Sequence, residues 1–109
     1  MRYNIPMAKY TKALNKSDLV SGAKKTVNVA GKQLMIANID GEFFAIDDAC
    51  THKGCSLGKE GMLNGSVVTC GCHGGQFDVT NGKVVAAPPS TDEAFYPVRV
   101  EGDDVMVLV

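Results

Sequence analysis

Apolar and polar positions alternate along most of the chain, and this alternation predicts β-strands. Pairs such as Asp40-Gly41 and Asn64-Gly65 separate the runs, and such pairs favour tight hairpins because both residues tolerate positive φ. A short helical turn is predicted near Ser17, Asp18 and Leu19. The predicted strands are 26–29, 33–39, 43–46, 67–69, 83–86, 96–101 and 105–109. The pattern therefore predicts an all-β protein.

Two stretches, 50–61 and 70–75, interrupt this strand pattern. Both are rich in glycine, both follow a predicted strand, and each begins with a cysteine. We expect them to be loops anchored on rigid strands, an arrangement that is common at functional sites.

Length and composition narrow the class of protein. A chain of 109 residues is long enough for one domain, and 45% apolar with 21% charged residues is ordinary for a folded soluble protein. The net charge of −1 argues against nucleic acid or an anionic membrane as the main partner. No apolar run approaches the roughly 18 residues of a membrane span, and the first residues lack a signal-peptide core. We therefore expect no membrane anchor and a cytoplasmic location.

All four cysteines and both histidines lie between Cys50 and His73. A disulfide framework usually spreads its cysteines along the chain, so this clustering indicates a metal site. The first loop offers Cys50 and His52, and the second offers Cys70 and His73. Four such ligands suit a tetrahedral zinc ion or a two-iron cluster. Structural zinc sites usually pair cysteine with cysteine and histidine with histidine, whereas each loop here mixes the two, which favours iron.

The sequences CTHKGC (50–55) and CGCHGGQFD (70–78) resemble the two cluster-binding boxes of the Rieske iron–sulfur family. The resemblance implies one 2Fe-2S cluster, with Cys50 and Cys70 on the inner iron and His52 and His73 on the outer iron. It extends through Gly82-Lys83 to Pro88-Pro89, which is similar to the family's proline-containing flap over the cluster.

The same resemblance implies a fold and a division of the chain. The expected fold is a Rieske-like antiparallel β-sandwich or barrel with a small cluster-binding subdomain inserted. Residues 1–109 would form a single domain. Its base would comprise 1–47 and 91–109, and the cluster-binding subdomain about 48–90.

Cys55 and Cys72 match the extra cysteine pair of the family's high-potential branch, as in respiratory cytochrome bc complexes. The resemblance implies a disulfide between them, and two buried free thiols are the alternative. Gly75 and Phe77 stand where that branch carries a serine and a tyrosine that donate hydrogen bonds to the cluster sulfurs. Neither has a side-chain donor, so the sequence combines the disulfide of one branch with the apolar surroundings of the other.

The resulting hypothesis is an electron-transfer protein and not an enzyme. As a Rieske-type ferredoxin, it would carry one electron at a time between a reductase and an oxygenase or other redox partner. The partner would dock near His52, His73 and Pro88. The main alternative is a soluble high-potential subunit of a respiratory bc-like chain. A redox sensor that uses the Cys55/Cys72 dithiol and a zinc-stapled interaction module remain open as alternatives of another class.

Overall fold

The structure, a computed structural model, describes residues 9–51, 54–72, 74–87 and 89–109, and most of these lie in strands. This confirms the predicted all-β class. In chain order the elements are β1 (Tyr10–Asn15), the 3-10 turn η1 (Lys16–Asp18), β2 (Lys24–Val29), β3 (Lys32–Ile39), β4 (Glu42–Asp47), α1 (Leu57–Glu60), β5 (Met62–Asn64), β6 (Val67–Thr69), β7 (Gln76–Asp78), β8 (Val84–Ala86), β9 (Phe95–Tyr96), β10 (Val98–Glu101) and β11 (Asp104–Leu108).

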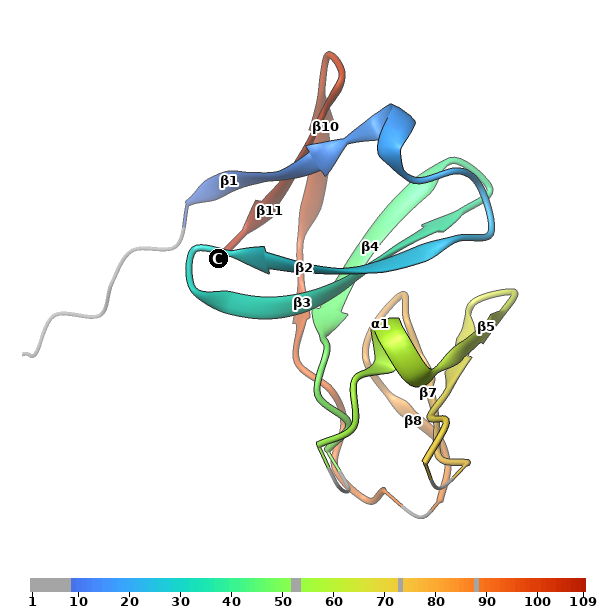
Figure 1. Ribbon diagram of the computed structural model, residues 1–109. Helices are drawn as coiled ribbons and strands as arrows, with labels where there is room; N and C mark the ends of the chain where they lie inside the picture. Colours follow the sequence, from blue (N-terminus) through green and yellow to red (C-terminus); the bar gives the residue numbers. More distant parts are fainter. Residues whose placement is uncertain (1–8, 52–53, 73, 88) are drawn as a thin grey trace, which may run out of the picture.

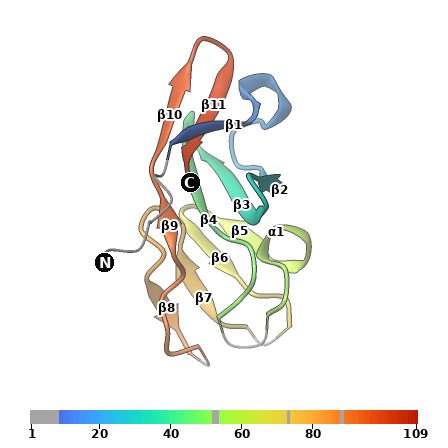
Figure 2. The same cartoon turned by 90° about the vertical axis from the view of Figure 1, so that its left-hand side faces the viewer.

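The strands form three antiparallel sheets. Their orders are β1-β11-β10, β2-β3-β4-β9 and β5-β6-β7-β8. The third sheet and α1 lie between β4 and β9 in sequence, and they occupy the lower part of the molecule in Figure 1 and Figure 2. Among the described residues, no helix is long and apolar enough to cross a membrane.

Strand β3 contributes its side chains to two separate cores. Leu34 and Ile36 pack with residues of β1, β4 and β11 in one core, and Met35 and Ala37 pack in a second core with residues of the inserted sheet. All four side chains are fully buried. The sheet β2-β3-β4-β9 is therefore the middle layer, and the inserted segment packs on one of its faces.

Several elements differ from the sequence prediction. Strands β1, β5 and β7 were not predicted, and the predicted strand 96–101 is divided at Pro97, which cannot donate a hydrogen bond to a ladder. The prediction that 50–61 lacks regular structure is wrong at α1. Ser56 caps this short helix, because its hydroxyl accepts a hydrogen bond from the Lys59 N–H at 3.1 Å.

The Asp48 side chain joins the middle sheet to the start of the inserted segment. It is 1% exposed. Its carboxylate accepts hydrogen bonds from the Thr26 hydroxyl at 2.9 Å, the Gln33 amide at 2.9 Å and the Gly58 N–H at 2.8 Å. These donors belong to β2, β3 and α1 respectively. Since a buried carboxylate is stable only when it is hydrogen-bonded, the three elements must meet around this residue.

The surroundings of Asp48 also set its protonation. Burial by itself raises the pKa of this carboxyl, but its hydrogen bonds together outweigh burial and hold the pKa below its usual value. A carboxyl whose pKa is lowered by folding stabilises the fold above its ordinary pKa of about 4, and this contribution is lost as the pH falls. Asp48 therefore stabilises the junction at neutral pH.

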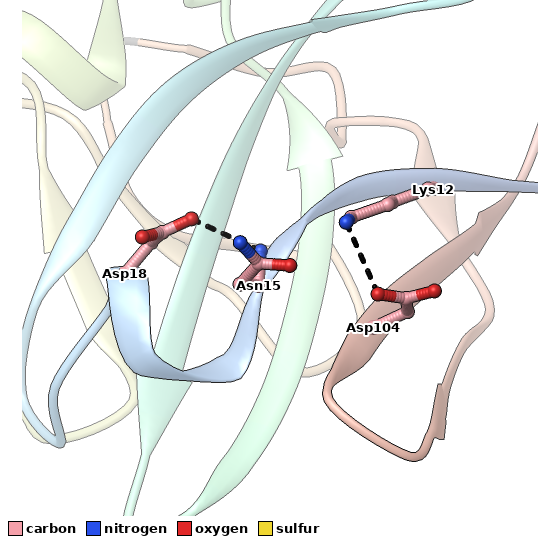
Figure 3. Close-up of polar contacts among 4 residues, drawn as sticks. All are labelled: Lys12, Asn15, Asp18 and Asp104. Carbon is pink, nitrogen blue, oxygen red and sulfur yellow. Dashed lines mark hydrogen bonds and ion pairs between the residues drawn. The ribbon is translucent and has the colours of Figure 1, made fainter.

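We expect Asp48→Ala to lower the free energy of unfolding by about 3 kcal/mol, because the donors of Thr26, Gln33 and Gly58 lose their acceptor. Urea denaturation followed by circular dichroism at neutral pH measures this. The control is Asp104→Ala on β11. Asp104 forms an exposed ion pair with Lys12 at 3.1 Å, with its side chain 45% exposed (Figure 3), and its loss should cost at most about 0.5 kcal/mol. Equal losses in the two variants would contradict the role assigned to Asp48.

Candidate metal centre

The two cysteine-led loops are hairpin ends with the same hydrogen-bond pattern. In the first, the Cys50 N–H donates to the Cys55 carbonyl at 2.8 Å, and the Gly54 N–H donates to the Cys50 carbonyl at 2.7 Å. In the second, the Cys70 N–H donates to the carbonyl of residue 75 at 2.7 Å, and the N–H of residue 74 donates to the Cys70 carbonyl at 3.0 Å. Each cysteine thus begins a six-residue loop that closes in the same way.

The similarity extends to the bases and the turns of the loops. An antiparallel pair closes each base, 49 with 56 in the first loop and 69 with 76 in the second. Gly54 and Gly74 occupy the same place in their loops, and their φ values are +78° and +76°. Only glycine adopts this backbone conformation without steric cost. The sequence therefore builds two equivalent loops, which begin 20 residues apart at Cys50 and Cys70.

Cys50 and Cys70 are buried in the same core. They are 3% and 2% exposed, and they pack with Leu57, Val68 and Phe77. Two thiols at equivalent positions of two loops, sheltered from water, match the sulfur ligands that an iron–sulfur cluster requires. The described part of the centre therefore fits a two-iron cluster held between the loops.

Cys55 and Cys72 form a disulfide with an S–S distance of 2.06 Å, as the family resemblance implied, and are not two free thiols. It ties the last residue of the first loop to the third residue of the second. The Cys70 sulfur lies within 4.8 Å of both disulfide sulfurs. Because two of these three sulfurs are bonded to each other, this group is not itself a metal site in the oxidised chain.

The second loop also lies directly against the end of α1. A Cβ atom on Gly71 would be 1.9 Å from the carbonyl oxygen of Glu60, so any larger residue at this position would force the two segments apart. The position of the second loop is therefore fixed by α1 as well as by the disulfide.

Thr51 lies between the predicted ligands Cys50 and His52, and two hydrogen bonds hold it. Its N–H donates to Oε2 of Glu93 at 2.9 Å, and its hydroxyl donates to the Thr91 carbonyl at 2.6 Å. The first loop is thus attached to the segment that follows the predicted proline flap.

Glu93 is a buried acid, with 4% of its surface exposed. Its pKa is raised to about 7: burial has the largest effect, the hydrogen bond from the Thr51 N–H works against it, and the negative charges of Asp47 and Asp48 add to it. Near neutral pH this side chain therefore exists in both protonation states, and only the ionised form places a charge beside the loop.

The structure brings together every predicted site residue that it describes. Cys50 and Cys70 lie in one core, and Cys55 and Cys72 are bonded to each other. The remaining predicted site residues, His52, His73 and Pro88, lie outside the described residues.

Sequence reasoning missed Asp48, Thr51 and Glu93, which position the loops. Nothing in the sequence distinguishes Glu93 from the neighbouring Asp92, because only the fold buries one and exposes the other. An acidic residue directly after an apolar strand, as Asp48 is, was the one available signal.

Glu93→Gln should make stability less dependent on pH. The folded pKa of about 7 lies above the ordinary value of 4.5, so the folded parent keeps a proton that the unfolded chain releases, and its stability falls as the pH rises from about 4.5 to about 7. The amide keeps an acceptor for Thr51 and has no charge. Urea denaturation at several pH values should show the free energy of unfolding of the variant gaining on that of the parent between about pH 4.5 and 7, by on the order of 3 kcal/mol at most.

The control for this prediction is Glu93→Ala, which also has no charge but leaves the Thr51 N–H without its acceptor. It should be less stable than Glu93→Gln at every pH. If the stability of the parent and of Glu93→Gln changed with pH in the same way, this would contradict the burial of a titrating acid at position 93.

Comparison with known proteins identifies the family of this chain. Residues 9–107 match the family described as the Rieske [2Fe-2S] domain. Among characterised relatives, the chain is 43% identical over 98 residues to the biphenyl dioxygenase ferredoxin subunit of Pseudomonas sp. strain KKS102, covering 90% of each chain. It is 37% identical over 99 residues to the ferredoxin component of the naphthalene 1,2-dioxygenase system of Pseudomonas putida, covering 91% of this chain and 94% of the relative.

Solved structures agree with the sequence comparison. The ferredoxin of carbazole 1,9a-dioxygenase from Nocardioides aromaticivorans IC177 superposes with a TM-score of 0.87 at 25% identity, covering 92% of this chain and 97% of that chain. A ferredoxin solved in complex with the oxygenase of carbazole 1,9a-dioxygenase gives a TM-score of 0.85 at 32% identity, covering 91% and 92%. With two buried cysteines on equivalent loops and a family match along nearly its whole length, this chain belongs to the Rieske [2Fe-2S] domain family and is a Rieske-type ferredoxin, an electron carrier with one 2Fe-2S cluster.

Proposed function

We propose that this ferredoxin accepts electrons one at a time from a reductase and passes them to the oxygenase of an aromatic-ring dioxygenase system. The observation that carries the proposal is the match along about nine tenths of each chain to ferredoxins of biphenyl and naphthalene dioxygenase systems. A ferredoxin of the same fold forms a complex with the oxygenase of carbazole 1,9a-dioxygenase, which supports an oxygenase as the acceptor.

The proposed ligands are Cys50 and Cys70 on the inner iron and His52 and His73 on the outer iron. The equivalent loops that begin at the two buried cysteines support the sulfur ligands. A bound cluster takes up and releases one electron, and two neutral imidazoles in place of two thiolates raise its potential above that of an all-cysteine cluster. The role of the protein is to hold the two loops in a fixed arrangement in both oxidation states of the cluster.

We place the docking surface for both redox partners near His52, His73 and Pro88. The two loops and segment 89–92 lie together at the lower end of the molecule, on the side opposite the turn between β10 and β11 (Figure 1 and Figure 2). Electron transfer needs a short path between centres, so the partner should contact the end where the loops meet.

The division into a base (1–47 and 91–109) and a cluster-binding subdomain (about 48–90) is part of the proposal. Among the described strands, β5 to β8 pair only with one another, and they are inserted between β4 and β9 of the middle sheet. Both observations support the boundaries.

The proposal also includes a cytoplasmic location. Disulfides are rare in the cytosol of mesophiles, so the Cys55–Cys72 bond would have to resist reducing thiols there. Cys55 packs against the core that contains Cys50 and Cys70, and this packing shields one of the two bonded sulfurs.

A respiratory bc-like subunit is the second candidate, and the Cys55–Cys72 disulfide is the observation that favours it. Phe77 argues in the other direction. It is fully buried in the core with Cys50 and Cys70 and has no hydroxyl to donate to a cluster sulfur. The two functions therefore differ in the reduction potential that they predict.

The ligand assignment predicts two irons and two acid-labile sulfides per purified chain. His52→Ala and His73→Ala should each lose the normal cluster, because an iron would lose one of its ligands. Iron and sulfide analysis with visible absorption spectra measures this. Lys83→Ala, at an exposed position outside both loops, is the control and should keep the full content. A stoichiometric zinc ion in protein made with ample iron would contradict the assignment.

The proposed function predicts a reduction potential near the lower end of the Rieske range, about −150 mV and not about +300 mV. Phe77→Tyr should raise it by roughly 40 mV, because a hydrogen bond to sulfur strengthens when the cluster gains an electron. Protein-film voltammetry measures both values.

The control for this prediction is Phe43→Tyr, which makes the same chemical change in the other core and should leave the potential unchanged. A parent potential near the upper end would favour the respiratory function. An unchanged potential in Phe77→Tyr would contradict the role of this side chain in tuning.

A further inference from the structure

Cys70 lies beside a disulfide to which it does not belong. Its sulfur is within 4.8 Å of the sulfurs of both Cys55 and Cys72. A thiolate exchanges with a disulfide by attacking one of its sulfurs, and the rate depends on how readily the two approach. When Cys70 does not bind iron, a potential nucleophile is therefore already close to its target.

We propose that Cys70 is the nucleophile of an internal thiol–disulfide exchange in the cluster-free chain. The deprotonated Cys70 sulfur attacks the Cys55 sulfur and forms a Cys55–Cys70 bond. The Cys55–Cys72 bond breaks, and the Cys72 sulfur leaves with the electron pair and takes up a proton from water. Cys70 gives its proton to water and Cys72 takes one back, so one disulfide and one thiol become another disulfide and another thiol, and the step needs no external oxidant or reductant.

The surroundings of the three sulfurs favour Cys55 as the point of attack. Attack on Cys55 releases Cys72, which is exposed, and water stabilises the departing thiolate. It also keeps the two loops tied together. Attack on Cys72 would instead close a small ring over Cys70-Gly71-Cys72, for which disulfide geometry is unfavourable, and would untie the loops.

Glu60 lies where it can stabilise Cys72 once the released sulfur has taken up its proton. Its Oε1 atom lies 3.7 Å from the Cys72 sulfur, within hydrogen-bond range for a sulfur donor. A disulfide sulfur has no proton to donate, so this bond becomes possible only when Cys72 is released as a thiol. The close approach of Gly71 to the Glu60 carbonyl keeps this helix end beside Cys72.

The consequence concerns reloading of the cluster. A chain with a Cys55–Cys70 bond has lost the Cys70 thiolate, which is one of the proposed iron ligands. It would accept a new cluster only after a thiol reductant, or the reverse exchange, restores Cys70. The exchange chemistry does not depend on the ligand assignment, but this consequence does.

Alkylation and peptide mapping test the exchange directly. Protein stripped of iron with a chelator is held at about pH 8.5, where thiolates form, then acidified and labelled with N-ethylmaleimide. Trypsin cleavage after Lys53, Lys59 and Lys83 places Cys50, Cys55 and the Cys70/Cys72 pair on three different peptides. Fragmentation of the third peptide then locates the label on Cys70 or Cys72.

We expect the label on Cys72 to exceed that on Cys70 several-fold, with Cys70 linked to the Cys55 peptide. Holoprotein held at the same pH without the chelator should retain the Cys55–Cys72 bond and carry no label on Cys72. A label on Cys70 with the original bond intact would overturn the proposal. A Cys55 peptide that is labelled and unlinked would overturn it as well, because the attack would then have occurred at Cys72.

Two matched variants remove the cluster without a chelator. Cys50→Ser keeps all three sulfurs of the exchange and should give the same label on Cys72. Cys70→Ser lacks the nucleophile and should retain the Cys55–Cys72 bond without label at either residue. Equal labelling of Cys72 in the two variants would identify a nucleophile other than Cys70.

Reconstitution separates this proposal from the ligand assignment. Exchanged wild-type chain should take up iron and sulfide several-fold faster after reduction by dithiothreitol than without it, as judged by metal content over time. If mapping shows the exchange but reloading is equally fast with and without the reductant, the exchange stands and Cys70 is not an obligatory ligand.

Discussion

The requirement that the buried carboxylate of Asp48 be hydrogen-bonded is the constraint from which the arrangement of the loops follows. Donors from β2, β3 and α1 converge on this side chain. The Leu57 N–H also donates to the main-chain carbonyl of Asp48 at 2.8 Å. Asp48 precedes Cys50 by two residues, so the same contacts fix the start of the first loop. A site supported in this way by rigid elements needs little rearrangement when it changes charge, which suits an electron carrier.

The remaining attachments of the loops differ in their chemistry. The disulfide joins one loop to the other, burial of Cys50 and Cys70 joins both to the core, and Glu93 joins the first loop to the segment before β9. The disulfide is sensitive to thiols and Glu93 to pH, whereas apolar burial responds to neither. No single change of conditions therefore releases the loops, and this redundancy protects a centre that contributes little regular structure of its own.

The all-β class, most strands and the two cysteine-led loops could be predicted because period-two alternation and ligand spacing are local properties of the sequence. The Cys55–Cys72 pairing followed from the family resemblance. The strands β5 and β7 were missed because, unlike the equally short β6 and β8, they contain no β-branched residue to indicate a strand. The equivalence of the two loops and the burial of Glu93 depend on contacts between distant segments, which alternation and spacing do not encode.

The combination of a disulfide with an apolar Phe77 indicates that two properties of Rieske centres can vary separately. The disulfide restrains the loops mechanically and adds no hydrogen-bond donor to a cluster sulfur. A hydroxyl at position 77 would instead stabilise the reduced cluster by a hydrogen bond and so raise its potential. A chain that resembles dioxygenase ferredoxins can therefore carry the Cys55–Cys72 disulfide without the high potential. The disulfide also introduces a hazard, because a disulfide close enough to hold the loops is close enough for Cys70 to attack. Iron ligation removes that hazard by occupying the thiolate, so cluster and disulfide protect each other only while both are present.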